Sequence, residues 1–267
     1  MELEGQRKQK RTMKKKNFMA TLLLTAACAC VICSCKDDED DGSGGSDTKE
    51  YVDLGLPSGT LWATCNIGAS SPEKYGSYFS WGETEFDSKY REEVNSQGTV
   101  IWSGYVYTWG TYTYSYTTEK STTMTKYCTE GKLGKEGFTD DLTELDASDD
   151  VATAKWGSEW QMPSQAQFQE LINSNNTTTT WTQQSGVNGR LIKSKKNGNS
   201  IFLPAAGNKE SKLLNDQGAK GYYWSRSLGT SSSDGSGLYF YSNVIGTDCD
   251  IDLARYMGLS VRPVRKK

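Results

Sequence analysis

The chain has 267 residues, a formal net charge of −3 and no histidine. The absence of imidazole excludes Ser-His-Asp and Cys-His nucleophiles and His-ligated zinc. Lysines and arginines are scattered beyond the first residues and form no basic stripe for phosphates, so we expect no nucleic-acid partner. Apolar residues make up 35% of the chain, and the surplus of Gly, Ser, Thr, Asn and aromatic residues is typical of loop-rich β structure.

Residues 1–34 have the pattern of a lipoprotein signal peptide. Seven basic residues precede the apolar run FMATLLLTAACACVIC, which is too short for a comfortable membrane span. The sequence ICSC that ends at Cys35 resembles a bacterial lipobox, which implies that Cys35 is lipidated and becomes the mature N-terminus. Cys28 is a second candidate, and an ordinary cleaved secretory peptide is the alternative.

Residues 35–49 are expected to be a tether. The acid run DDEDD at 37–41 is followed by a flexible Gly/Ser segment. An acid run directly behind a lipidated cysteine resembles the export tag of Bacteroidota lipoproteins. That resemblance implies an outer-membrane lipoprotein exposed on the cell surface, with the membrane bound through its lipid.

Residues 50–267 are expected to form one domain, beginning with short strands and turns between 50 and 84. Residues 85–100 are polar and predicted to be a mobile excursion. An aromatic run follows, and its side chains change face at Gly110, where we expect a bulge or turn. These rings could stack on sugars or pack across strands, and packing is the more common role: Tyr105, Tyr107, Trp109, Tyr112, Tyr114 and Tyr116.

Two helices are predicted. In SDDVATAKWG, Ser148 is a candidate N-cap and Gly157 a stop signal. In MPSQAQFQELI, Ser164 and Gln167 have capping-box spacing, and the stripe Phe168, Leu171 and Ile172 predicts a core-facing side.

A hairpin and a β-rich segment complete the predicted elements. Asn197-Gly198 lies between two strand-like runs and predicts a hairpin. The segment from 221 to 265 is β-rich and ends in SVRPVR, where Val261 and Val264 alternate with Arg262 and Arg265. Pro263 interrupts that alternation, as an edge strand permits.

Seven motifs in order carry a family resemblance: VDLGLPSGTLWATCNIGA, YGSYFSWGET, MTKYC, WGSEWQMPS, NGNSIFLPAAG, GYYWS and GLSVRPVR. Together they resemble the Fibrobacter succinogenes major paralogous domain of Bacteroidota surface lipoproteins, over residues 51–265. The resemblance implies an α+β, C-type lectin-like domain, with two helices flanking small antiparallel sheets, pairing of the N- and C-terminal strands, and long ligand-binding loops. Trp62, Trp81, Trp156, Trp160 and Trp224 lie within these motifs and are expected in the core.

Metal and cysteine chemistry receive little support. Asp248, Asp250 and Asp252 alternate and could offer carboxylates to calcium, but Leu253 and Leu259 occupy the Gly and Glu positions of an EF-hand loop. We therefore expect no metal site and no cofactor. Cys65, Cys128 and Cys249 cannot all pair; we expect Cys65 and Cys128 to be buried apolar residues or to form a bridge, whereas Cys249 lies in the C-terminal tail of mixed composition. The implied fold is shared with formylglycine-generating enzymes, but the cysteine spacing favours a protein that is not an enzyme.

The segment from 226 to 257 is the candidate ligand-binding surface. It mixes aromatic and adaptable polar residues without an apolar period and resembles a paratope: Arg226, Tyr239, Tyr241, Asn243, Thr247, Asp248, Asp250, Asp252 and Tyr256. An ordinary hairpin with solvent-facing residues is the alternative. The resemblance extends to lectin-fold lipoproteins whose C-terminal patch is rewritten by a diversity-generating retroelement.

These patterns predict a cell-surface lipoprotein that binds an extracellular protein or glycan for adhesion or recognition. The alternative is a non-catalytic structural or accessory subunit of a surface complex.

Overall fold

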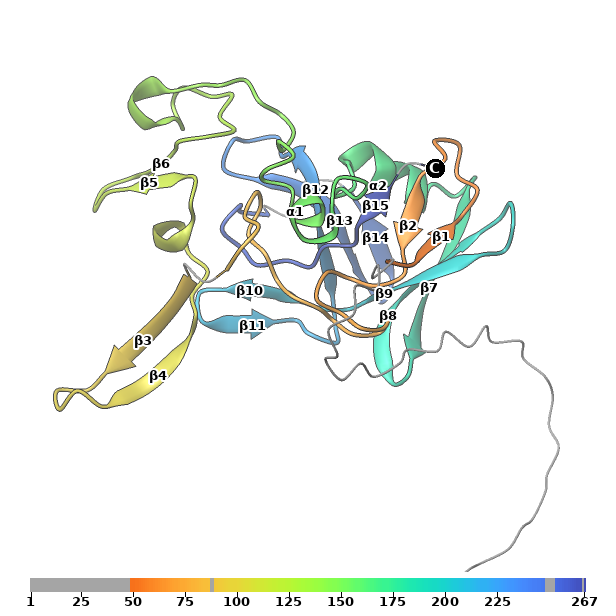
Figure 1. Ribbon diagram of the computed structural model, residues 1–267, viewed down its shortest axis with the longest axis horizontal. Coiled ribbons are helices and arrows are strands. Elements are labelled where there is room, and N and C mark those ends of the chain that lie inside the picture. The colour runs from red at the N-terminus through yellow and green to blue at the C-terminus, as the bar shows by residue number, and fades with distance from the viewer. Residues whose placement is uncertain (1–48, 87–88, 248–252, 266) are drawn as a thin grey trace, which may run out of the picture. The chain divides into compact units, whose positions relative to one another are not determined.

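The computed structural model describes residues 49–86, 89–247, 253–265 and 267 (Figure 1). They belong to one compact unit, Ser43–Lys267, separate from Met1–Gly42. The predicted signal peptide, the lipidation residue Cys35 and the acid run all lie outside the described residues.

Antiparallel strands dominate the described residues. Helix α1 (Val151–Trp156) has six residues and α2 (Gln165–Ile172) has eight, whereas fifteen strands form six small sheets. The expected α+β, C-type lectin-like class is therefore wrong, because the fold is β-rich. Helical periodicity is confined to these two short segments, while aromatic and β-branched runs divided by glycine turns fill the rest of the domain.

Three sheets have three strands each. The first places β2 (Leu61–Ala63) between β1 (Tyr51–Asp53) and β15 (Val264–Arg265). The second is the meander of β7 (Thr177–Gln184), β8 (Val187–Ser194) and β9 (Ser200–Pro204). The third joins β12 (Gly221–Leu228), β13 (Gly235–Tyr241) and β14 (Val244–Gly246).

Three further sheets are two-stranded hairpins: β3 (Tyr90–Val94) with β4 (Val100–Tyr105), β5 (Ser115–Thr117) with β6 (Thr122–Met124), and β10 (Asn208–Glu210) with β11 (Leu213–Asn215). Two short 3-10 helices, η2 (Trp109–Thr111) and η3 (Lys135–Gly137), lie in the connections. The element η2 accounts for the change of face that the aromatic run shows at Gly110.

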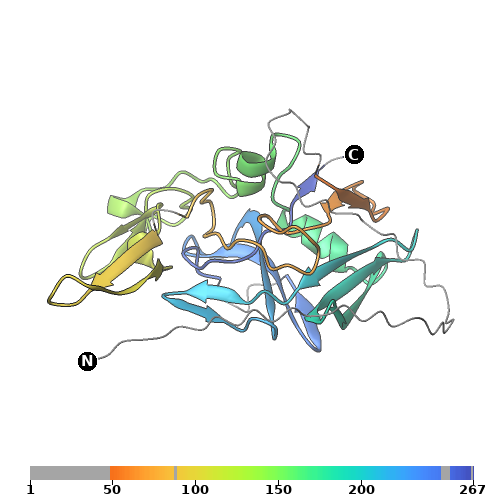
Figure 2. The ribbon, with the colours of Figure 1, turned by 60° about the horizontal axis from the view of Figure 1, so that its bottom comes forward.

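The polar stretch 85–100, predicted to be an excursion, contains regular structure in its described part. Most of it belongs to the β3–β4 hairpin, in which Tyr90 pairs with Tyr105 and Glu92 with Ser103. The side chain of Asn95 accepts backbone N–H groups in the turn at 2.9 and 3.0 Å. Figures 1 and 2 show this hairpin, in yellow, extending away from one end of the β10–β11 hairpin.

The predicted helix signals are largely confirmed. In α2, the side chain of Ser164 accepts the N–H of Gln167 and the side chain of Gln167 accepts the N–H of Ser164, which completes the capping box. In α1 the N-cap is Asp150 instead of Ser148, because the Asp150 carboxylate accepts two backbone N–H groups of the first turn. Gly157 ends α1 at φ 93°.

The predicted hairpin around Asn197-Gly198 is confirmed. Strands β8 and β9 pair on either side of it, and Gly198 has a φ of +79°, which glycine adopts readily. At the C-terminal end, only Val264 and Arg265 of SVRPVR form a strand. Arg262 is fully buried instead of facing outward, because it donates to the side chain of Asn66 and to backbone carbonyls.

The core consists of two main apolar clusters. One is built around Trp81, Trp224 and Trp160, and the other around Trp62 and residues of α2. The predicted core stripe of α2 is confirmed for Phe168 and Leu171, which are fully buried. Trp156 is only half-buried and meets Trp160 edge-on.

Candidate functional site

Two residues of the candidate surface lie exposed at the turn between β13 and β14. Tyr241 is 39% exposed and Asn243 is also exposed. The guanidinium of Arg190 donates to the backbone carbonyls of Tyr241, Ser242 and Val244, so the turn is held from beneath. This turn is an ordered, accessible part of the surface.

Other members of the set point inward or lie outside the described residues. Tyr239 is half-buried against the apolar cluster of Trp81, and Thr247 is only 7% exposed. Thr247 therefore presents little area to a ligand in this structure. Asp248, Asp250 and Asp252, together with Cys249, lie outside the described residues.

Arg226 and Tyr256 are separated from that turn. Arg226 lies toward the opposite end of the β12–β13 pair and forms an ion pair with Glu144 at 2.9 Å. Tyr256 meets Trp109 edge-on and donates its hydroxyl to Glu210 at 2.8 Å. Burial and that carboxylate raise the pKa of Tyr256 to about 12. The described members of the predicted set therefore do not form one continuous surface.

The aromatic run mainly serves packing. Tyr107 and Tyr112 are buried and donate their hydroxyl groups to backbone carbonyls. Burial raises the pKa of both phenols. Tyr116 is 46% exposed, with the ammonium group of Lys135 over its ring. Cross-strand and interelement packing thus account for most of the run.

A groove between two hairpins is the most distinctive cavity of the described residues. We call it the hairpin groove. It has a volume of about 350 Å³, near the lower end of the roughly 300–1,000 Å³ typical of small-ligand sites. Its walls come from β4, β10 and β11 and the turn between them: Trp102, Ser103, Gly104, Tyr105, Lys209, Lys212, Leu213 and Leu214.

The two lysines of the groove have different surroundings. Lys212 lies 4.5 Å from the ring centre of Trp102 and forms an ion pair with Glu93. Lys209 is half-buried, and its ammonium lies 5.1–5.8 Å from the ring centres of Tyr78, Tyr105 and Tyr107. Burial lowers the pKa of Lys209, and no carboxylate of the described residues acts against that shift. Lys209 is therefore a partly desolvated cation without an acidic partner among the described residues.

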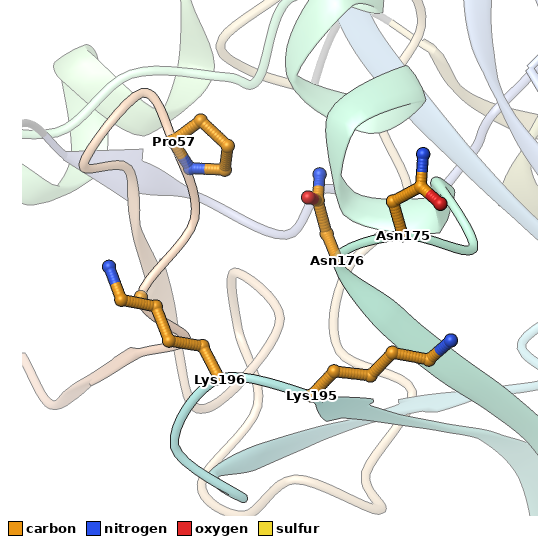
Figure 3. Close-up of a pocket in the computed structure, with 6 residues that line it drawn as sticks. Pro57, Asn175, Asn176, Lys195 and Lys196 are labelled. Atoms are coloured by element: carbon orange, nitrogen blue, oxygen red, sulfur yellow. The ribbon is translucent and has the colours of Figure 1, made fainter.

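A second cavity, of about 320 Å³, lies between the β1–β2 loop, the segment after α2 and the β8–β9 turn (Figure 3). Pro57, Asn175, Asn176, Lys195 and Lys196 line it, together with Gly55. Asn176 donates to the carbonyl of Glu170 and Lys195 to that of Ser174. No aromatic ring lines this cavity, so it offers a ligand no stacking surface.

A third cavity, of about 500 Å³, is lined by Ser158, Glu159, Gln161, Arg265 and Lys267. Its charges are also paired, Arg265 with Glu159 and Lys267 with Asp53. Of the three cavities, only the hairpin groove is lined by aromatic rings, and its Lys209 is paired with no acid of the described residues.

A cluster of titratable residues lies beside α1. Lys126 forms ion pairs with Asp146 and Asp149 at 2.8 and 2.7 Å, and the hydroxyl of Tyr127 donates to Asp149. Burial alone would raise the pKa of Asp149, but the hydrogen bonds from Lys126 and Tyr127 outweigh it and hold that pKa below 3.8. Mutual neutralisation of this kind stabilises the loop around Tyr127, whose φ is +56°.

Metal and cysteine chemistry find no organised site in the described part of the chain. Its His, Cys, Asp and Glu residues form no group of three that could hold a metal ion. Cys65 and Cys128 are not joined by a disulfide, and the buried thiol of Cys128 donates to the carbonyl of Glu130 at 3.2 Å. Within the same residues, every helix is too short or too polar to cross a bilayer.

Sequence reasoning missed most of the hairpin groove, although Tyr105 was among the aromatic candidates. The available signal was the apolar run Val100–Ile101–Trp102 inside a polar stretch, followed much later by the exposed pair Leu213–Leu214. These segments are far apart in the sequence and are brought together by contacts such as the antiparallel pair of Tyr107 with Ser211 and the ion pair of Lys212 with Glu93.

Comparisons with known proteins give no independent assignment. No protein-family model, no curated protein and no solved structure matches this chain.

Proposed function

We propose that this chain is a non-catalytic, lipid-anchored protein of the outer cell surface that binds an extracellular protein or glycan through the hairpin groove. The observation that carries the proposal is the groove itself, where apolar and aromatic walls surround a lysine that pairs with no acid in the described part of the chain. Binding sites commonly combine such walls with a few polar groups that orient the ligand.

The location rests on the N-terminal pattern and on the resemblance to the major paralogous domain. The lipobox-like sequence ending at Cys35 and the acid run behind it support lipidation and display. Globomycin treatment is expected to leave a heavier precursor that keeps its signal peptide, and Cys35→Ala is expected to leave an unlipidated precursor. Unchanged mature mass and membrane attachment in both experiments would contradict the anchor.

The binding site is tested with Trp102→Ala in the groove and Tyr241→Ala at the β13–β14 turn. Wild-type and variant proteins are compared on glycan arrays and against surface proteins extracted from neighbouring and host cells. We expect Trp102→Ala to lose the ligand and Tyr241→Ala, an exposed aromatic outside the groove, to retain it. Loss only in Tyr241→Ala would move the site back to the C-terminal surface. A stoichiometric membrane partner unaffected by both changes would favour an accessory subunit.

A further inference from the structure

The walls of the hairpin groove are strand edges. We propose that the groove takes an extended peptide carrying an acidic side chain, which adds as a strand along β4 and places its carboxylate at Lys209. This inference rests on the proposed function, since it requires the groove to be the binding site. Strand addition draws affinity from backbone hydrogen bonds and specificity from side-chain contacts beside the edge.

Consecutive residues of two strands line the groove, from 102 to 105 in β4 and from 212 to 214 at β11. Successive side chains of a strand point to opposite faces, so a cavity bordered by consecutive residues follows the strand's edge. Among the described residues, β4 pairs only with β3 and β11 only with β10. The edges that border the groove therefore have no strand partner there.

The ladder pattern identifies the backbone groups on the β4 edge. The N–H of Val106 donates to Lys89 on the β3 side, at 2.9 Å. Because backbone groups alternate between the two sides of a strand, those of Ser103 and Tyr105 point away from β3. Tyr107 has the same phase, and its N–H and C=O pair with Ser211 at 2.9 and 2.8 Å. That pair closes one end of the groove.

Strand β11 presents a backbone group in the same way. Lys209 exchanges backbone hydrogen bonds with Gly258 at 2.8 and 2.9 Å, on the side of β10 that faces away from β11. Leu214 lies directly opposite Lys209 in the β10–β11 ladder. By the same alternation, the N–H and C=O of Leu214 point away from β10. A peptide in the groove would thus meet backbone donors and acceptors along β4 and at β11.

The two edges of the β3–β4 hairpin differ in how well they resist pairing. Natural edge strands are commonly protected by charged residues, prolines or short length. Strand β3 has the sequence YREEV, with three charges. Strand β4 has the sequence VIWSGY and carries neither a charge nor a proline, and its Ile101 is 65% exposed. The unprotected edge is the one that borders the groove.

Charge selects the chemistry of the occupant. Lys212 is already paired with Glu93, whereas the ammonium of Lys209 faces the rings of three tyrosines and pairs with no acid of the described residues. A carboxylate supplied by the ligand would form a charge-assisted hydrogen bond with the ammonium group of Lys209. A sugar ring would compete with Lys212 for a face of Trp102, and it would leave the strand edges unused. These contacts favour an acidic peptide over a glycan.

The experiment screens the purified full-length protein, in detergent, against random nine-residue peptides and against a glycan array. We expect peptides in which an Asp or Glu stands among β-branched or aromatic residues. Amide hydrogen exchange is then measured with and without the tightest peptide. Exchange should slow at the amides of Ser103, Tyr105 and Leu214. It should remain unchanged at Trp102 and Gly104, which lie in the same strand β4 but whose amides already face β3.

Changes to the protein and to the peptide test the contribution of charge and that of the backbone hydrogen bonds separately. Lys209→Gln should weaken binding about tenfold, and Lys193→Gln, an exposed lysine on β8, should leave it unchanged. Replacing the acid of the peptide by its amide should cost a similar factor and remove any further effect of Lys209→Gln. N-methylation of every second peptide amide should abolish binding when the methylated amides are those that face β4. Methylation of the other set should leave binding unchanged. Circular dichroism confirms that the Lys209→Gln protein remains folded.

The outcomes separate the two proposals. Glycans that bind in a Trp102-dependent manner while no peptide binds would overturn strand addition and leave the proposed function standing. If neither peptides nor glycans bind the protein, both the strand-addition proposal and the proposed function are overturned. Peptide binding without protection of Ser103 and Tyr105, or a concentration-dependent dimer that protects these amides without peptide, would also overturn the acidic peptide as the occupant.

Discussion

Replacing Arg255 is expected to destabilise the domain more than replacing any surface arginine. The side chain is fully buried. Its guanidinium donates to the hydroxyl of Tyr112 at 2.8 Å and to the carbonyl of Ser232 at 2.8 Å. It also donates to the carbonyls of Tyr127 and Lys126, each at 3.0 Å. One side chain thus ties together three separate segments of the chain.

The magnitude follows from these four acceptors. A hydrogen bond to a charged group contributes about 1.5–3 kcal/mol, and water entering the vacated space recovers part of that. We therefore expect Arg255→Ala to lower the free energy of unfolding by about 4 kcal/mol, a large fraction of the roughly 5–15 kcal/mol typical of a domain. Arg255→Lys should lose about half as much, because an ammonium cannot span acceptors placed for a planar fork.

Urea unfolding followed by tryptophan fluorescence measures both variants. Arg226→Gln is the control, since its ion pair with Glu144 is partly exposed and such pairs contribute about 1 kcal/mol or less. If Arg255→Ala unfolds at the same urea concentration as Arg226→Gln, the reasoning from buried acceptors is refuted.

Three further predictions follow from the packing. Acidification should destabilise the domain as the pH falls through about 3.8 and below, because the folded pKa of Asp149 is lower than its unfolded value; thermal melts of Asp149→Asn should show a weaker loss. Lys89→Met should lower the free energy of unfolding in urea by about 3–5 kcal/mol, because it leaves Glu83 as a buried unpaired charge. Adding Glu83→Leu should recover much of that loss, and no recovery would argue against the 2.6 Å ion pair. Gly258→Ala should cost about 1–3 kcal/mol, since a Cβ there would lie 2.6 Å from the ring of Tyr107, and an unchanged melting temperature would contradict this close packing.

Local chemistry predicted the features that depend on neighbouring residues. The capping box of α2, the end of α1 at Gly157 and the turn at Gly198 follow from side chains a few positions apart. The predicted fold class was wrong because the resemblance implied a larger helical share than the structure has. The two helices are short, and their length is set by packing against the rest of the domain.

The candidate site was harder to predict for a different reason. The hairpin groove depends on Tyr107 meeting Ser211, a contact across about a hundred residues that leaves no local pattern. Burial of Thr247 and the ion pair of Arg226 are likewise set by distant neighbours, α2 in one case and Glu144 in the other. Composition identified aromatic and polar residues that could bind a ligand, but it could not tell which of them face the same space.

The sheet in which β2 separates β1 from β15 bears on how this domain can be rearranged. Adjacent strands lie about 4.8 Å apart, so the first and last strands are separated by only about 10 Å. A short glycine-serine bridge could therefore join them, while new termini open in the exposed turn between Asn95 and Gly98. Such a circular permutant should retain its sheets, and the same proximity suits the domain to insertion as a cassette within another protein's loop.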